Sequence, residues 1–190
     1  ARAGNKESRS PTLPTNCGWM TGRRSPRLRK ALEDQASIVK TLIIKVLGKS
    51  GDKSAIPLLE ESYKDEQASV RLAAAGALYR SGRAEMWDVI QKAASAQNPE
   101  ERATALRMIG ELQDPRGLSI LTEALINTQP SVRGAAASGL GDLGKVEAIP
   151  ALQGVLDDKI PAVRTSATIS LGELGAREAI PSLRKSLSDG

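Results

Sequence analysis

Side chains that commonly carry out catalysis or bind metals are scarce in this sequence. His is absent, and Cys17 is the single cysteine among 190 residues. Imidazole acid–base catalysis, a Ser–His or Cys–His couple and a metal cage of His and Cys ligands are therefore excluded within the chain. Carboxylates are plentiful, but no pair of them is set apart as a general acid and base. We predict no catalytic residue, no metal ligand and no cofactor-binding residue, and a protein that is not an enzyme.

One glycine motif has the spacing of a dinucleotide-binding fingerprint. Residues Gly139–Gly144 read GLGDLG, which fits GxGxxG, and Asp158 lies near the distance at which that fingerprint has its acidic residue. The fingerprint requires a strand before its first glycine. Here the glycines end a run of small residues typical of a helix, so we interpret the match as accidental.

Arginines recur at an interval of 31 residues, and aligned guanidinium groups could bind phosphate or another anion. The pair Val70-Arg71 returns as Glu101-Arg102, Val132-Arg133 and Val163-Arg164, and Val39-Lys40 stands one step earlier. Other columns keep the same step: Gly48, Tyr79, Gly110, Gly141 and Gly172; Gly51, Gly82, Gln113, Gly144 and Gly175; Ile56, Trp87, Leu118, Ile149 and Ile180. Agreement between independent columns indicates an internal repeat.

Two helices in each repeat must position these residues. Residues 131–144 read as a helix of small residues that ends at Gly144 in a left-handed turn, and we name this type helix A. Residues 148–158 place Ile149, Leu152 and Leu156 on one helical face with Pro150 in the first turn, and we name this type helix B. Two helices of about 12 residues each cannot shield their apolar faces alone, so neighbouring pairs must stack.

The pattern VRxxAAxxLGxLG…AIPxL…LxD resembles the HEAT-like repeat family of phycobiliprotein lyases over residues 24–190. The resemblance implies an all-α fold, a right-handed α-solenoid of about five HEAT-like helix pairs with an N-terminal capping helix. In that family an Asp in the turn between repeats commonly pairs with the Arg six positions later. The resemblance therefore favours a structural ladder over an anion site for the repeated arginines.

The ladder that the resemblance implies is incomplete in this chain. Its positions are Asp34 with Lys40, Asp65 with Arg71, Ala96 with Arg102, Asn127 with Arg133 and Asp158 with Arg164. Asn127 replaces the acid in one turn, and Ala96 abolishes it in another. We therefore expect a local change of curvature at the third unit.

The sequence divides into a short leader and one domain. Residues 1–22 are rich in Gly, Ser, Pro, Thr and Arg and lack periodicity, so we expect them to be disordered or a non-native leader. The domain covers 23–190, with the helix cap at 24–36 and repeats at 37–67, 68–98, 99–129, 130–160 and 161–190. No capping helix follows the last unit, so we expect the apolar edge made by Leu183 and Leu187 to contact a partner or to continue in a longer protein.

The outward side of the B helices is the predicted partner-binding surface, because the resemblance to HEAT-like solenoids implies that it lines the concave face. One of its columns is apolar through three units, which suits docking of a helix or an extended peptide. The alternative is that these side chains are half-buried between adjacent B helices. Trp87 shares the column of Ile149 and is interpreted as a core residue. The predicted partner-binding residues are Leu58, Glu61, Val89, Lys92, Ile120, Glu123, Arg184 and Lys185.

A regular repeat without a catalytic set predicts a cytoplasmic scaffold that binds another protein. One alternative, implied by the resemblance alone, is an accessory subunit of a bilin lyase-type enzyme. The other is nucleic-acid binding through a basic segment, because residues 1–37 hold 8 Lys and Arg against 3 Asp and Glu while the remainder is balanced at 19 each. The neutral body and the scarcity of aromatic residues argue against nucleic acid as a partner. No apolar run is long enough to span a membrane, and no signal-like stretch is present.

Overall fold

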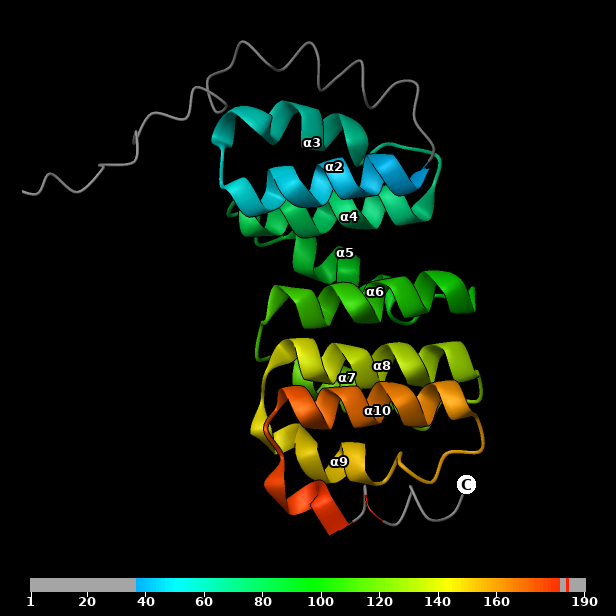
Figure 1. The fold of residues 1–190 in the computed structure, drawn as a ribbon. Coiled ribbons are helices and arrows are strands. Elements are labelled where there is room, and N and C mark those ends of the chain that lie inside the picture. Colours follow the sequence, from blue (N-terminus) through cyan, green and yellow to red (C-terminus); the bar gives the residue numbers. More distant parts are fainter. Residues whose placement is uncertain (1–36, 182–183, 185–190) are drawn as a thin grey trace, which may run out of the picture.

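The computed structural model describes residues 37–181 and 184, and within them the chain forms two layers of helices without a strand. The A helices are α2 (Ser37–Ser50), α4 (Ala68–Arg80), α6 (Pro99–Leu112), α8 (Pro130–Leu143) and α10 (Pro161–Glu173), which follow one another along the stack in Figure 1. The B helices are α3 (Ile56–Ser62), α5 (Met86–Ala93), α7 (Gly117–Ala124) and α9 (Ile149–Gln153). This arrangement confirms the predicted all-α solenoid. The predicted leader and the capping helix at 24–36 lie outside the described residues.

The B helices are shorter than the sequence pattern predicted. They span five to eight residues instead of about 12, because part of each predicted segment forms tighter turns. Short 3-10 helices precede three of the B positions: η2 (Lys53–Ala55), η3 (Val146–Ala148) and η4 (Arg177–Ala179). Helix α9 then ends at Gln153, before Gly154, whose high conformational entropy disfavours further helix. Among the described helices none is both long and apolar enough to cross a membrane.

The hydrophobic core lies between the two layers. Its centre on the B side is a column that recurs every 31 residues and is at most 1% exposed, made by Leu59, Ile90, Leu121 and Leu152. The neighbouring column, which contains Trp87 and was predicted to lie in the core, is only partly buried. Trp87 and Ile149 are buried as predicted, but Ile180 is 52% exposed. That expectation is wrong for Ile180 because no further layer of described residues follows η4.

Helix A packs on helix A through contacts that only small side chains permit. A Cβ built on Gly48 of α2 would lie 2.6 Å from the Cβ of Ala77 in α4, and one on Gly110 of α6 would lie 2.5 Å from the Cα of Gly139 in α8. Real Cβ atoms do not approach other atoms so closely. The glycine column therefore allows the backbones of neighbouring A helices to lie against each other.

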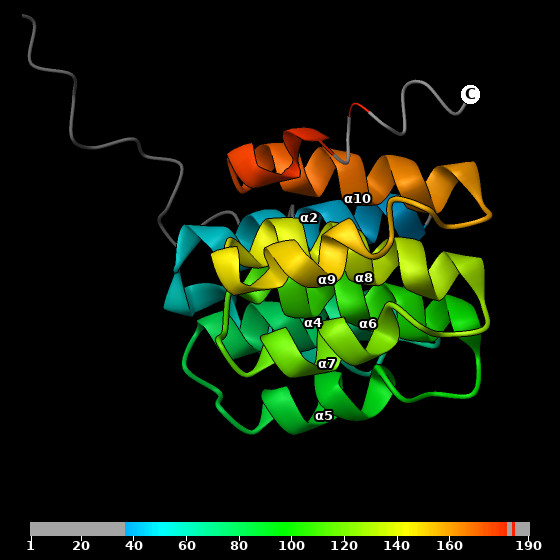
Figure 2. The same ribbon diagram turned by 90° about the horizontal axis from the view of Figure 1, so that it is seen from below.

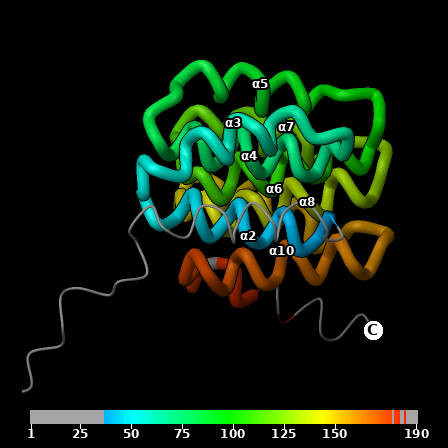
Figure 3. Tube along the Cα trace, turned by 90° about the horizontal axis from the view of Figure 1, so that it is seen from above, coloured from blue at the N-terminus to red at the C-terminus, as the bar shows by residue number. Residues whose placement is uncertain are grey.

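The close spacing of the A helices places them on the inside of the curve. Figures 2 and 3 show α2 and α10, the two ends of the A layer, bending toward the side away from α5 and α7. Lys45 of α2 even forms an ion pair with Glu111 of α6, at 2.6 Å between Nζ and Oε1 and two A helices along the stack. The expectation that the B helices line the concave face is therefore wrong. Small residues bring the A helices close together, whereas bulkier B-layer side chains keep the B helices apart.

The stacking is loosest between α4 and α6, where the sequence predicted a change of curvature. Consecutive A helices share fewer close approaches there than at any other step. Two large side chains explain the wider spacing. Tyr79 occupies the position that Gly48 and Gly110 hold in other repeats, and Met108 of α6 lies directly against Gly76 of α4.

The close packing of the A layer predicts opposite outcomes for two glycine substitutions. Gly110→Ala should destabilise the protein by about 1–3 kcal/mol, because the added methyl group overlaps the backbone of Gly139. The control Gly172→Ala, in the same column, adds a methyl group that meets nothing within 4 Å and should stabilise by up to about 1 kcal/mol through helix propensity. Urea denaturation measures both free energies of unfolding. Equal effects of the two substitutions would contradict the packing account.

Candidate functional site

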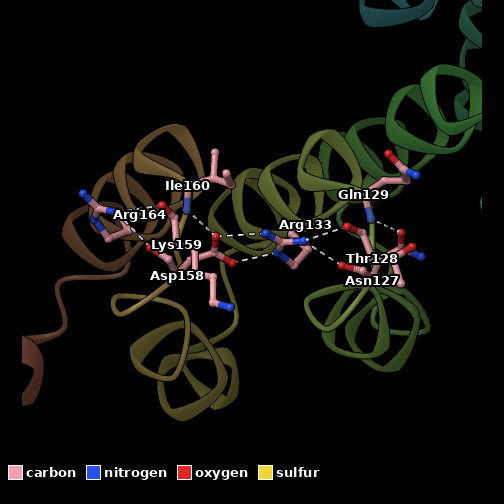
Figure 4. A network of polar contacts seen from close by, with 8 residues as sticks. All are labelled: Asn127, Thr128, Gln129, Arg133, Asp158, Lys159, Ile160 and Arg164. Atoms are coloured by element: carbon pink, nitrogen blue, oxygen red, sulfur yellow. Dashed lines mark hydrogen bonds and ion pairs between the residues drawn. The ribbon is translucent and has the colours of Figure 1, made fainter.

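A ladder of polar contacts runs along one edge of the stack, where the turns between repeats meet the start of each helix A. Each repeated arginine donates to the backbone carbonyl six positions earlier: Arg71 to Asp65 at 3.0 Å, Arg102 to Ala96 at 2.9 Å, Arg133 to Asn127 at 2.8 Å and Arg164 to Asp158 at 2.8 Å. Figure 4 shows two of these rungs. Because the acceptor belongs to the backbone, this hydrogen bond forms with any side chain at the acceptor position.

The acidic side chains of the ladder bind the cation near the start of helix A in their own repeat. Asp158 accepts two hydrogen bonds from Arg133, from Nε at 2.7 Å and from Nη2 at 2.9 Å, and Asp65 accepts one from Nζ of Lys40 at 2.9 Å. The expectation that each acid bonds the arginine six positions later is therefore wrong in its direction. The carboxylates reach back 25 residues, because the forward arginine already bonds the carbonyl of the same turn. The predicted pair of Asp34 with Lys40 lies partly outside the described residues.

Each ladder carboxylate also caps the turn that leads into the next helix A. An oxygen of Asp158 accepts the backbone N–H of Ile160 at 2.8 Å, and one of Asp65 accepts that of Gln67 at 2.9 Å. The hydrogen bonds from Arg133 are the main reason why the pKa of Asp158 lies below its ordinary value. For Asp65 the backbone N–H of Gln67 is the main cause, followed by Lys40. One carboxylate thus ties helix A of its own repeat to the turn that leads into the next helix A.

The concave face carries a column of charged side chains whose sign reverses along the stack. The column recurs every 31 residues and consists of Lys49, Arg80, Glu111, Asp142 and Glu173. The first four line one hollow of about 600 Å³ together with glycines and Gln113. In this column the first two residues are therefore basic and the last three acidic.

Like charges gather at the acidic half of this column. Burial raises the pKa of Asp142 above its ordinary value, and the neighbouring carboxylates of Glu111 and Glu173 raise it further, while Lys45 and Lys49 partly offset the effect. The carboxylates therefore repel one another across three A helices. A cation placed among them would relieve this repulsion.

A second cluster, which the sequence analysis missed, joins repeats two and three near the C-terminal ends of α4 and α6, away from the ladder. The hydroxyl of Tyr79 donates to Oδ2 of Asp114 at 2.5 Å, and the guanidinium of Arg116 stacks 4.3 Å from the ring centroid of Trp87. Hydrogen bonds from Arg116 hold the pKa of Asp114 well below its ordinary value. The signal was present in the sequence, because Tyr79 and Trp87 are the aromatic exceptions in two repeat columns. Their role here is structural, since Trp87 is only 3% exposed.

Six of the predicted partner-binding residues lie on the B helices α3, α5 and α7. Leu58 is buried, so the expectation of an exposed apolar strip is wrong there; it adjoins Leu59 on a helix whose apolar face packs into the core. Val89 and Ile120 are half-buried against the core, whereas Glu61, Lys92, Glu123 and Arg184 are exposed. Lys185 lies outside the described residues.

The glycine motif at 139–144 lies in a helix and not after a strand. Gly139 and Gly141 are buried within α8, and Gly144 ends that helix in the left-handed region at φ 71°. This confirms that the dinucleotide match is accidental. Within the described residues no group of three His, Cys, Asp or Glu side chains is arranged to hold a metal ion.

Comparison with known proteins identifies the repeats. The family described as HEAT repeats matches residues 25–94, 63–130, 88–159 and 127–190. The complex of CpcE and CpcF of phycocyanin lyase from Nostoc sp. PCC7120 has a similar structure, with a TM-score of 0.54 and 19% identity over 93% of this chain and 73% of that chain. Weaker likenesses are human deoxyhypusine hydroxylase (TM-score 0.43, 16% identity, 79% of this chain and 84% of that one) and an engineered protein (0.48, 19%, 85% and 84%). No curated protein matches the sequence.

The ladder predicts that Asp158→Asn destabilises the fold in a pH-dependent way. At pH 7 the substitution should cost about 1–3 kcal/mol, because Arg133 loses its charged acceptor. The folded-state pKa of Asp158 lies below its ordinary value of 3.8, so its contribution is complete above about pH 5 and is lost as the pH falls through the folded-state pKa.

The difference between the native protein and Asp158→Asn should therefore shrink toward about pH 2. Urea denaturation at both pH values measures it. Glu123→Gln, at an exposed position on α7, serves as the control and should change stability by less than about 0.5 kcal/mol. A difference of the same size at both pH values would show that the ion pair contributes nothing.

Proposed function

The chain belongs to the HEAT-repeat family, and from this premise we propose that it is a scaffold that binds a segment of another protein in its concave face. The observation that carries the proposal is the charged column Lys49, Arg80, Glu111, Asp142 and Glu173. A partner segment with acidic residues at one end and basic residues at the other would match it in a single orientation. Electrostatic complementarity of this kind favours specificity and fast association.

The charges on the concave face are available to a partner at little cost. Arg80 and Asp142 are exposed, and the pair of Lys45 with Glu111 retains 34% and 26% side-chain exposure. Ion pairs in such positions contribute little to stability, so exchanging one for a pair with a partner is nearly neutral for the fold. The repulsion around Asp142 adds a favourable contribution when a basic partner residue arrives.

The closely packed A layer suits this role because it presents the charges on a surface of defined shape. Except between α4 and α6, neighbouring A helices touch through backbone and small side chains, which leave few ways to repack. A preorganised surface reduces the entropy lost on binding. The proposal assigns the chain no catalytic residue.

The two alternatives from the sequence remain predictions without specific support. Likeness to the phycocyanin lyase subunits, at 19% identity, extends to the fold and no further. The basic segment that favoured nucleic acid lies outside the described residues. The exposed charges on the B side, Glu61, Lys92, Glu123 and Arg184, also remain a prediction for contacts on the outer face.

Charge reversal on the two faces separates a concave from an outer binding surface. Asp142→Lys should reduce recovery of the native partner about tenfold or more, because a charged interface position has been inverted. Glu123→Lys changes the net charge equally but lies on α7, and it should leave recovery unchanged. Crosslinking mass spectrometry in the native cell, after circular dichroism shows that both variants fold, measures the recovery. Loss of the partner in Glu123→Lys alone would overturn the proposal.

A further inference from the structure

The ladder lacks its carboxylate at the junction of repeats two and three. Lys40 and Arg133 each bind an aspartate 25 residues later, and the corresponding residue for Arg71 is Ala96. Among the described residues no carboxylate forms an ion pair with Arg71. Its guanidinium is nevertheless held in place, because Nη1 donates to the carbonyl of Asp65 at 3.0 Å and to that of Glu66 at 2.7 Å.

The nitrogens of Arg71 that remain are those that bind the ladder acid elsewhere. In Arg133, Nη1 bonds the carbonyls of its own turn while Nε and Nη2 hold Asp158. Arg71 repeats the first half of this arrangement. Arg102 differs, because its Nε and Nη2 already bond the carbonyls of Ala96 and Gln97. At the next junction, where Asn127 replaces the acid, Arg102 therefore has no comparable pair of donor nitrogens left.

A cavity of about 630 Å³ opens beside Arg71 at the position of Ala96. Val89 and Ala93 of α5 form an apolar wall, and the exposed Lys92 adds a positive charge at the rim. Glu101 also lines the cavity, where the other four repeats have valine. Its negative charge disfavours a dianion such as phosphate more than it disfavours a single carboxylate.

We infer that this cavity is a receptor for the side-chain carboxylate of an aspartate in an extended peptide, which completes the ladder from outside. The carboxylate accepts from Nε and Nη2 of Arg71, in the geometry that Asp158 has with Arg133. A planar guanidinium fixed by its other nitrogen favours such two-point recognition. The apolar wall contacts the residue beside the aspartate. This site lies outside the concave face and does not depend on the proposed function.

The test uses a small probe and a variant that fills the site from within. N-acetyl-aspartate N-methylamide is titrated into the full chain while the Nε–H signals of the arginines are followed by nuclear magnetic resonance at constant ionic strength. We expect a saturable shift of the Arg71 signal and none of the Arg133 signal. The matched amide, N-acetyl-asparagine N-methylamide, should bind at least about tenfold more weakly, because it lacks the charge.

Ala96→Asp should abolish the response, since the new side chain takes the place of the probe, and it should raise the unfolding temperature by closing the ladder. Glu101→Val, which restores the residue of the other repeats, should tighten probe binding. The inference is wrong if Arg71 does not respond, if both probes shift it equally, or if Ala96→Asp binds the probe as the native chain does. None of these outcomes bears on binding in the concave face, because no macromolecular partner is present.

Discussion

The structure depends on the close approach of its A helices. Glycine and alanine at the contact positions let α2 reach α4 and α6 reach α8 at backbone distance, which a larger residue at Gly48 or Gly110 would prevent. The B helices carry leucine, isoleucine and tryptophan toward the same core and stand farther apart. Two layers with unequal spacing must curve, and the layer with the smaller spacing lies inside. Curvature in this chain is thus a consequence of side-chain volume.

That constraint also decides which charges face each other. Because the A layer is the inner one, side chains one repeat apart on it converge, and Lys45 can reach Glu111 across two steps of the stack. The same convergence brings Glu111, Asp142 and Glu173 close enough to raise the pKa of the middle carboxyl. A cavity lies beside Arg71 where the ladder lacks its acid.

The sequence predicted the local elements well because they follow from periodic signals. The 31-residue step, the core position of Trp87 and the left-handed end of α8 at Gly144 are all visible in the repeat columns. It could not predict which layer is inside, since that depends on distances between helices and not on their apolar faces. The sequence also could not predict which cation Asp158 binds, because Arg133 and Arg164 both lie near its carboxylate. Arg164 bonds the backbone carbonyl of Asp158, so the carboxylate binds Arg133. The sequence could not predict that Leu58 is buried either, because its burial depends on side chains that only the fold brings next to it.

Distance measurements by electron spin resonance test the inner position of the A layer most directly. In a Cys17→Ser background, one variant carries spin labels at positions 49 and 142 on the A side, and another carries them at positions 57 and 150 on the B side. Both pairs are 93 residues apart, and all four positions are exposed. The account predicts a clearly shorter distance for the A pair than for the B pair. Equal distances, or a longer distance for the A pair, would contradict it.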